Sequence, residues 1–388
     1  MDLISGNRNL LILGASQIIA VTGSVLMVTL GGIVGAALST NPALATLPPT
    51  LMVVGTALGS IPGAALMKQI GRPAGFALAK LLAALACCIA VFGLATESFV
   101  LWVSAAGTFG LTLAFVQQYR FAAAESVSPD RVSRAISWVL LGSIGGAFLG
   151  PQLAVAGRDW LGWGPYTGSL AVLGGLCLVS SLLLTRLNDP DPVSAAAQRP
   201  DEAAPASLRR AYWVAVLGGI TAYGVMTLVM TATPLAMHLN HSHGMEDVAW
   251  VIQSHVVAMY LPSLVSGWLI DRFGARRLML VGSGFLAIAL LAGLGGEAVM
   301  HFWWSLVLLG LGWNFLYVGS TALLTTSYRP EDRFRAQSLN DFCVFGSAAA
   351  ASWLAGVTLH YLGWTSLIGL ALPLVMLLPA GLLLVRSR

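Results

Sequence analysis

The chain has 388 residues, of which 57% are hydrophobic and only 9% are charged. Its mean hydropathy is +0.81. These values exclude a soluble globular domain and are typical of a polytopic membrane protein. The net charge of +4 does not indicate a nucleic-acid partner, because the positive residues are expected on one side of the membrane.

The apolar segments predict an all-α membrane protein with twelve transmembrane helices. We expect these spans near residues 10–37, 47–67, 74–95, 98–119, 135–156, 164–185, 211–237, 248–270, 278–296, 301–325, 337–359 and 364–385. All lysines and arginines except Arg158 then fall at cytoplasmic ends or loops, which places both termini in the cytoplasm. The first apolar run is too long for a cleavable signal, and no A-x-A site follows it.

The twelve spans divide into two sets of six. We expect an N-terminal six-helix bundle over residues 1–186, a cytoplasmic linker over 187–209 and a C-terminal six-helix bundle over 210–388. The stretch from Leu187 to Ser207 is rich in Pro, Asp and Ala, as a solvated linker is. Residues 58–71 align with 261–274, and 129–137 with 330–338, which indicates an internal duplication.

The seventh and eighth spans carry two pairs of soft ligands at helical spacing. Met226 and Met230 are four residues apart, as are His255 and Met259, so each pair projects from one face of its helix. If the helices are antiparallel neighbours, the four donors lie at two matched depths, about 12 Å and about 18 Å inside the membrane. Thioether and imidazole ligands suit Cu(I). Packing of methionine in an apolar core is the alternative for the Met pair alone.

The outer loop between these spans is rich in metal-binding side chains. It contains His238, His241, His243 and Met245 within eight residues. Such a cluster could capture copper and pass it inward by ligand exchange. The alternative is a solvated loop in which the histidines bind no metal.

The loop after the eighth span contains a charged motif that begins at Gly267 and has the spacing G-x-x-x-D-R-x-G-x-R-R. We expect it to act as a conformational latch by pairing with helix ends of the other half. Its residues are Asp271, Arg272, Gly274, Arg276 and Arg277. The alternative is that these charges only orient the loop toward the cytoplasm. The first-half copy, residues 63–72, lacks the acidic residue.

This motif, together with the span count, the linker and the repeat, resembles the major facilitator superfamily. The resemblance implies that the first, fourth, seventh and tenth spans line a central cavity. Polar candidates for its wall are Gln17, Gln117, Gln118, Asn314 and Tyr317. No Asp or Glu is expected at mid-membrane, with Asp341 and Glu125 the nearest, which weakens a proton-coupled carrier. The four cysteines, Cys87, Cys88, Cys177 and Cys343, are expected to be small buried residues.

The paired Met-x-x-x-Met and His-x-x-x-Met motifs are similar to those of the CcoA-like copper importers. That resemblance implies an inner-membrane carrier that imports copper for assembly of cbb3-type cytochrome oxidase, with Met226, Met230, His255 and Met259 as ligands. Copper is then the substrate, expected as Cu(I), with membrane lipid and a cytoplasmic copper chaperone as partners. No cofactor, no enzymatic activity and no nucleic acid are expected.

Two other functions remain open on the sequence alone. One is a major facilitator carrier of a small organic solute or drug, in which Met226 and Met259 only pack in the cavity wall. The other is a membrane-embedded metal sensor or assembly factor that binds without transport.

Overall fold

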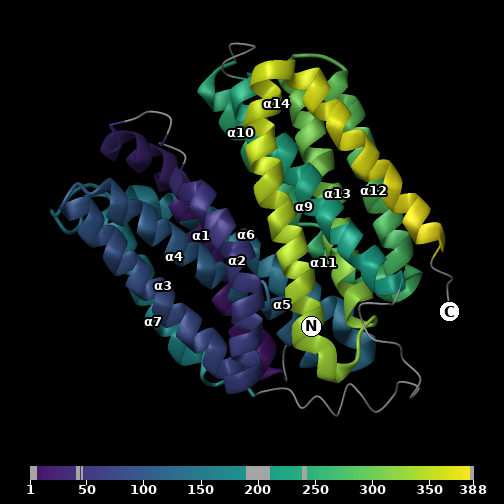
Figure 1. Cartoon of the computed structure of the whole chain (residues 1–388), viewed down its shortest axis with the longest axis horizontal. Helices are drawn as coiled ribbons and strands as arrows, with labels where there is room; N and C mark the ends of the chain where they lie inside the picture. The colour runs from purple at the N-terminus through teal and green to yellow at the C-terminus, as the bar shows by residue number, and fades with distance from the viewer. Residues whose placement is uncertain (1–6, 41–43, 45–46, 189–209, 238–242, 385–388) are drawn as a thin grey trace. The chain divides into compact units, whose positions relative to one another are not determined.

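The computed structural model describes residues 7–40, 44, 47–188, 210–237 and 243–384 (Figure 1). These residues form helices and connecting turns, with no strand among them. Eleven helices in this part of the chain are long and apolar enough to cross a membrane. The expected all-α fold is therefore confirmed.

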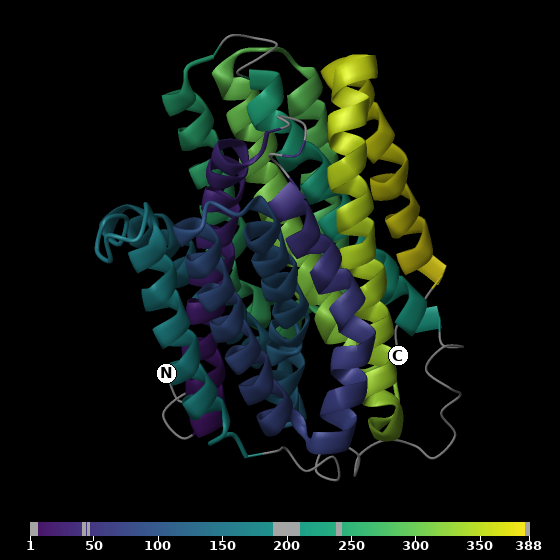
Figure 2. The ribbon, with the colours of Figure 1, turned by 60° about the vertical axis from the view of Figure 1, so that its left-hand side comes forward.

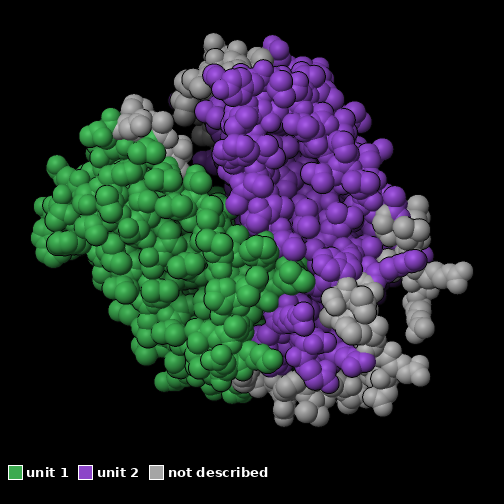
Figure 3. Space-filling model, viewed as in Figure 1, with its two compact units in different colours: residues 1–127, 138–194, 337–342 green, residues 128–137, 195–336, 343–388 purple. Residues whose placement is uncertain are grey.

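The chain forms two compact units, coloured separately in Figure 3. The first comprises residues 1–127, 138–194 and 337–342. Its helices are α1 (Arg8–Leu38), α2 (Leu47–Ile70), α3 (Arg72–Ala95), α4 (Phe99–Val116), α5 (Tyr119–Glu125), most of α6 (Val132–Ala156) and α7 (Thr167–Leu184). Within this unit α4 packs on α2 and α3, and α7 packs on α3 and α1.

The second unit comprises residues 128–137, 195–336 and 343–388. Its helices are α9 (Arg210–Leu235), α10 (Met245–Tyr260), α11 (Ser263–Phe273), α12 (Ala275–Leu294), α13 (Val299–Thr325) and most of α14 (Arg333–Leu384). Short 3-10 turns, Pro129–Arg131 and Pro330–Asp332, precede α6 and α14. Helix α13 packs on α9, α10 and α12.

Two short segments group with the unit of the other half of the sequence. Residues 128–137, which lead into α6, belong to the second unit, and residues 337–342, near the start of α14, belong to the first. The domain boundaries expected from the sequence, 1–186 and 210–388, do not anticipate this exchange. Most of the expected linker, residues 189–209, lies outside the described residues.

Helix α14 contains the last two spans. Its 52 residues would be about 78 Å long as one straight helix, far more than the roughly 30 Å hydrocarbon core. Gly363 interrupts it with a positive φ of 76°, a conformation that favours glycine. Figures 1 and 2 show the two parts of α14 running side by side in opposite directions. The twelve expected spans thus match the eleven long apolar helical segments of the described residues, because α14 supplies two spans, while α4 with α5 and α10 with α11 count as one segment each.

The eighth span is broken where a single helix was expected. Helix α10 ends at Tyr260 and α11 begins at Ser263. The break contains Pro262, which has no N–H to continue the helical ladder. The fourth span is likewise divided, between α4 and α5.

Single glycines reverse the chain at two positions that the internal repeat aligns. Gly71 separates α2 from α3 with φ 83° and ψ 158°, and Gly274 separates α11 from α12 with φ 85° and ψ 150°. This region of backbone space is essentially restricted to glycine. The two copies therefore keep the same turn although the first has lost its aspartate.

Candidate functional site

His255 is fully buried and faces α13. Its side chain has 0% exposure, and its Nδ1 lies 2.7 Å from the carbonyl oxygen of Leu306. Because a carbonyl can only accept, Nδ1 carries the proton and Nε2 carries the lone pair. Nε2 is buried without a hydrogen-bond partner among the described residues. A backbone carbonyl that holds a neutral imidazole in this way leaves Nε2 oriented to accept a hydrogen bond or to bind a metal.

The other three expected copper ligands lie on α9 and α10 and differ in burial. Met226 and Met259 are buried, at 7% and 6% exposure, and Met230 is half-buried. Helices α9 and α10 both pack on α13 but have few direct contacts with each other. Among the described residues no three His, Cys, Asp or Glu side chains are grouped to hold a metal. The four-ligand site stays a prediction.

The expected capture loop is only partly described. His238 and His241 lie outside the described residues, and Met245 is the first residue of α10. The Nε2 of His243 hydrogen-bonds the carbonyl oxygen of Glu297 at 2.7 Å, and its ring meets the edge of Phe302 at 6.0 Å. His243 therefore has a structural role in this conformation, and metal capture stays a prediction.

The expected latch residues make contacts within the second unit. Arg134 Nε donates to Asp271 Oδ2 at 2.6 Å. Arg276 donates to the carbonyl of Leu382 near the end of α14. Arg272 lies 5.5 Å from the ring of Trp268, Gly274 forms the turn described above, and Arg277 is exposed. Their action as a latch stays a prediction.

A buried polar network in the first unit surrounds Arg72. Its Nη2 donates to Glu125 Oε1 at 2.7 Å and to Gln337 Oε1 at 2.8 Å. Its Nη1 donates to the carbonyl of Gln118 at 3.3 Å. Sequence reasoning had singled out Glu125 but not its partners. A second buried ion pair, Arg120 with Asp341, lies in the same unit.

The polar residues suggested for the cavity wall are largely engaged between helices. Gln17 donates to Ser143 Oγ at 2.9 Å. Asn314 donates to the carbonyl of Met259 and to Ser263 Oγ, both at 2.7 Å, and accepts from Ser266 Oγ at 2.6 Å. These contacts make Asn314 a structural side chain that bridges the break between α10 and α11.

Aromatic rings from four helices meet in the second unit. The ring of Tyr223, on α9, lies edge-on to Trp313 at 5.3 Å, Tyr317 at 5.0 Å and Phe345 at 5.0 Å. Trp313 stacks on Tyr317 at 5.1 Å, and Tyr260 meets Trp313 at 5.6 Å. We call these five residues the aromatic cluster. The sequence had singled out only Tyr317, since ring contacts between distant helices leave no local pattern.

The aromatic cluster has a buried wall and a more accessible rim. Trp313 and Tyr317 are 0% and 1% exposed, whereas Tyr223 and Tyr260 are half-buried. Trp313 Nε1 is a buried donor with no hydrogen-bond partner among the described residues. Beside the cluster, a Cβ on Gly346 would meet nothing within 4 Å. The cluster thus combines two half-buried tyrosine rings at its rim with a buried N–H donor that has no partner among the described residues.

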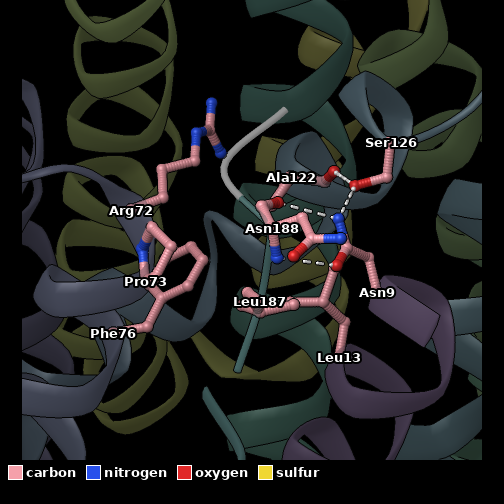
Figure 4. Close-up of a pocket in the computed structure, with 9 residues that line it drawn as sticks. All are labelled: Asn9, Leu13, Arg72, Pro73, Phe76, Ala122, Ser126, Leu187 and Asn188. Atoms are coloured by element: carbon pink, nitrogen blue, oxygen red, sulfur yellow. Dashed lines mark hydrogen bonds between the residues drawn. The ribbon is translucent and has the colours of Figure 1, made fainter. Parts of the chain in front are cut away.

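A small pocket in the first unit is not suited to a solute. Asn9, Leu13, Arg72, Phe76, Ser126 and Asn188 are among the residues that line it (Figure 4). Its cavity volume is about 10 Å³, room for one water molecule. Figure 4 shows Asn9 hydrogen-bonded to Asn188 and Ser126, at 2.9 and 3.0 Å through its Nδ2. These contacts tie the start of α1 to the ends of α5 and α7.

Comparison with known proteins gives consistent matches along the chain. The family model described as Major Facilitator Superfamily matches residues 12–246 and 215–388. The chain is 39% identical to the "Riboflavin transporter RfnT" of Brucella anthropi over 390 aligned residues, covering 99% of this chain and 97% of that protein. It is 30% identical to the "Uncharacterized MFS-type transporter YddS" of Bacillus subtilis, covering 93% and 86%. The crystal structure of the human organic anion transporter MFSD10 superposes with a TM-score of 0.77 at 14% identity, covering 97% and 99%.

Proposed function

The chain belongs to the major facilitator superfamily, and from that premise we propose that it carries a small planar organic solute of the riboflavin class. As a member, it is a multi-pass transporter of a bacterial inner membrane and not an enzyme. The narrower membership expected from the Met and His motifs is not supported, because the relative at 39% identity is a riboflavin transporter and not a copper importer. The organic-solute alternative therefore becomes the main proposal.

The observation that carries this proposal is the aromatic cluster with its unpaired Trp313 N–H. A flavin has a planar ring system with carbonyl groups at one edge. Such a ring stacks on or meets the edges of tyrosine and tryptophan rings, each pair contributing about 0.5–1.5 kcal/mol beyond area burial. A ring carbonyl can accept from Trp313 Nε1, which satisfies a buried donor that has no partner among the described residues.

Riboflavin exchange in vesicles tests the proposal. Purified protein is placed in lipid vesicles loaded with unlabelled riboflavin, and entry of labelled riboflavin is measured. We expect Trp313→Phe, which keeps the ring and removes the N–H, to raise the half-saturating concentration about threefold to tenfold. We expect about a tenfold rise for Tyr223→Leu, which removes three ring contacts.

The control is Trp353→Phe, since Trp353 is 69% exposed. It should exchange riboflavin as the unmodified chain does. If the unmodified chain is folded in the vesicles and exchanges no riboflavin, the proposal is contradicted. Equal loss in Trp313→Phe and Trp353→Phe contradicts the role of the cluster.

Copper import for cbb3-type oxidase assembly is the second candidate. The observation that favours it is the free Nε2 of fully buried His255, with Met259 one helical turn away. In this mechanism Met230 and His255 meet the ion first, and Met226 and Met259 complete its coordination during alternating access. A chaperone would receive the ion in the cytoplasm.

Copper accumulation in the same vesicles separates the two candidates. Each of Met226, Met230 and Met259 is changed to Leu, which keeps side-chain volume, and His255 is changed to Gln. If the chain imports copper, copper accumulates inside the vesicles over time, and each change reduces this accumulation. A metal sensor binds copper, but no copper accumulates inside the vesicles. A change of the three loop histidines, His238, His241 and His243, to Ala should reduce uptake chiefly at low external copper. Riboflavin exchange without copper filling excludes the copper mechanism.

A further inference from the structure

Arg120 and Asp341 form a deeply buried ion pair. Arg120 Nη2 donates to Asp341 Oδ1 at 2.5 Å, and the two side chains are 2% and 0% exposed. Both residues belong to the first unit and lie within apolar spans. Removing two charges from water costs more free energy than their mutual attraction provides, unless further hydrogen bonds stabilise the buried pair. Ionisable groups inside a membrane usually have a role in transport.

The carboxylate of Asp341 has two more donors, and one of them has an unused acceptor. Gln118 Nε2 donates to Asp341 Oδ2 at 2.6 Å, and Asn340 Nδ2 donates to Oδ1 at 3.0 Å. Gln118 is 1% exposed, and its Oε1 is buried without a hydrogen-bond partner among the described residues. A buried acceptor left in this way is costly and needs an explanation.

We propose that Asp341 is the proton-binding site of the transport cycle, with Arg120 as its partner when ionised and Gln118 as its partner when protonated. The inference rests on the proposed carrier function. A proton from water adds to one carboxylate oxygen, and the charge of the pair rises from zero to +1. A half-turn of the Gln118 amide then places Oε1 where Nε2 was, and Oε1 accepts from the new O–H. The proton returns to water when the O–H bond breaks.

Arg120 keeps other contacts when Asp341 is neutral. Its Nη1 lies 3.3 Å from Gln117 Oε1, and its guanidinium carbon lies 4.4 Å from the centre of the Phe121 ring. A hydrogen bond and a cation–π contact therefore hold the charge after the ion pair breaks. This makes the neutral state of Asp341 accessible in a buried place.

Other titratable groups near Asp341 include Arg72 and Cys343. Arg72 contacts the carbonyl of Gln118 at 3.3 Å, and its charge is matched by Glu125 at 2.7 Å. Cys343 lies two residues further along α14 and is half-buried. Asp341, which the sequence placed near the start of the eleventh span, is fully buried.

The experiment uses riboflavin as the solute in vesicles containing the full chain. Exchange is measured without a gradient, and accumulation is measured with a gradient of one pH unit imposed in each direction. At zero membrane potential one proton per solute allows accumulation of about tenfold for one direction of the gradient. We expect Asp341→Asn to retain exchange and to lose accumulation entirely. Asp130→Asn is the matched control, since Asp130 is 74% exposed, and it should accumulate as the unmodified chain does.

Two results overturn the proposal: accumulation by Asp341→Asn equal to that of the unmodified chain, or exchange by the unmodified chain with no response to either gradient. If Asp341→Asn does not fold, the double variant Arg120→Gln with Asp341→Asn removes both charges and takes its place.

If the unmodified chain exchanges no riboflavin, the proposed function fails separately. Proton binding is then decided by the infrared carbonyl band of a protonated carboxyl group in a pH titration. A band missing in Asp341→Asn supports the proposal, and a band unchanged in Asp341→Asn overturns it.

Discussion

Arg134 and Asp271, 137 positions apart in the sequence, form an ion pair of 2.6 Å in the second unit. Arg134 is near the start of α6, and Asp271 is near the end of α11, directly before the turn at Gly274. A Cβ on Gly267 would come within 2.7 Å of the Cα of Arg134. Gly267, the first residue of the charged motif, thus allows α11 to approach the start of α6 closely enough for Asp271 to pair with Arg134.

The first prediction concerns this pair as a latch. Its side chains are 50% and 20% exposed, so the pair contributes only about 0.2–1 kcal/mol to stability. If it holds one transport conformation, Asp271→Asn and Arg134→Gln should each change the initial transport rate about twofold to fivefold. Melting temperatures should hardly change. The measurement is vesicle uptake together with thermal unfolding in detergent.

Exchange of the two charges provides the matched test. The double variant Asp271→Arg with Arg134→Asp should return the initial transport rate to that of the unmodified chain. The control Asp130→Asn affects a looser pair, 3.6 Å from Arg131, and should leave the rate unchanged. If the single variants transport at the normal rate, the latch hypothesis is wrong, and these charges only orient the loop toward the cytoplasm.

The second prediction concerns the turn at Gly274. Its φ of 85° requires glycine, yet a Cβ there would meet no atom within 4 Å. Gly274→Ala therefore tests backbone strain alone, at an expected cost of about 1–3 kcal/mol. Gly175→Ala is the control, because Gly175 is helical and also has open space around it. The control should melt at the same or a higher temperature, and a similar fall in both would contradict the strain argument.

The spans were predictable because each depends on a local property, a long apolar run. The turns at Gly71 and Gly274 were flagged by the repeat, since glycine positions are read directly from the sequence. The break at Pro262 also has a local cause, although the hydropathy of residues 248–270 hid it. What these features share is that no distant residue decides them.

The contacts that matter for the sites were not predictable in this way. Arg120 and Asp341 are 221 positions apart, and Arg72 and Gln337 are 265 apart. The helical spacing of His255 and Met259 was real, but spacing cannot say which neighbour the helix faces. Here His255 faces α13, since its Nδ1 lies 2.7 Å from the carbonyl oxygen of Leu306. The two helices are close at Gly310, where an added Cβ would lie only 2.8 Å from the His255 carbonyl oxygen. The pattern of four donors therefore predicts a metal site, and whether the donors converge depends on the packing of α9 and α10 around α13.

The third prediction concerns Asn314 at the break between α10 and α11. Its amide contacts Met259, Ser263 and Ser266, and all of these groups are buried. Asn314→Leu should cost about 1–3 kcal/mol, because it leaves buried polar groups without their partner. Ser283→Ala is the control, since Ser283 Oγ bonds only within its own helix, to the carbonyl of Met279. Thermal unfolding in detergent measures both, and equal effects would show that Asn314 does not stabilise the break.

The fourth prediction concerns Arg72, which is 1% exposed. Arg72→Met removes the positive partner of Glu125 together with the hydrogen bonds to Glu125, Gln337 and the Gln118 carbonyl. It should cost about 3–5 kcal/mol because it leaves a largely buried negative charge without its positive partner. Lys68→Met, at an exposed position in the last turn of α2, should change stability by only about 0.5 kcal/mol.

The double variant Arg72→Met with Glu125→Gln separates charge from packing. Glutamine keeps the shape of Glu125 without its charge, so the buried negative charge is removed. If the loss in Arg72→Met comes from that charge, the double variant should recover most of the melting temperature. Recovery is measured by thermal unfolding of the four proteins side by side. A double variant as unstable as Arg72→Met alone would mean that the hydrogen bonds to Gln337 and to the carbonyl of Gln118 carry the stability instead.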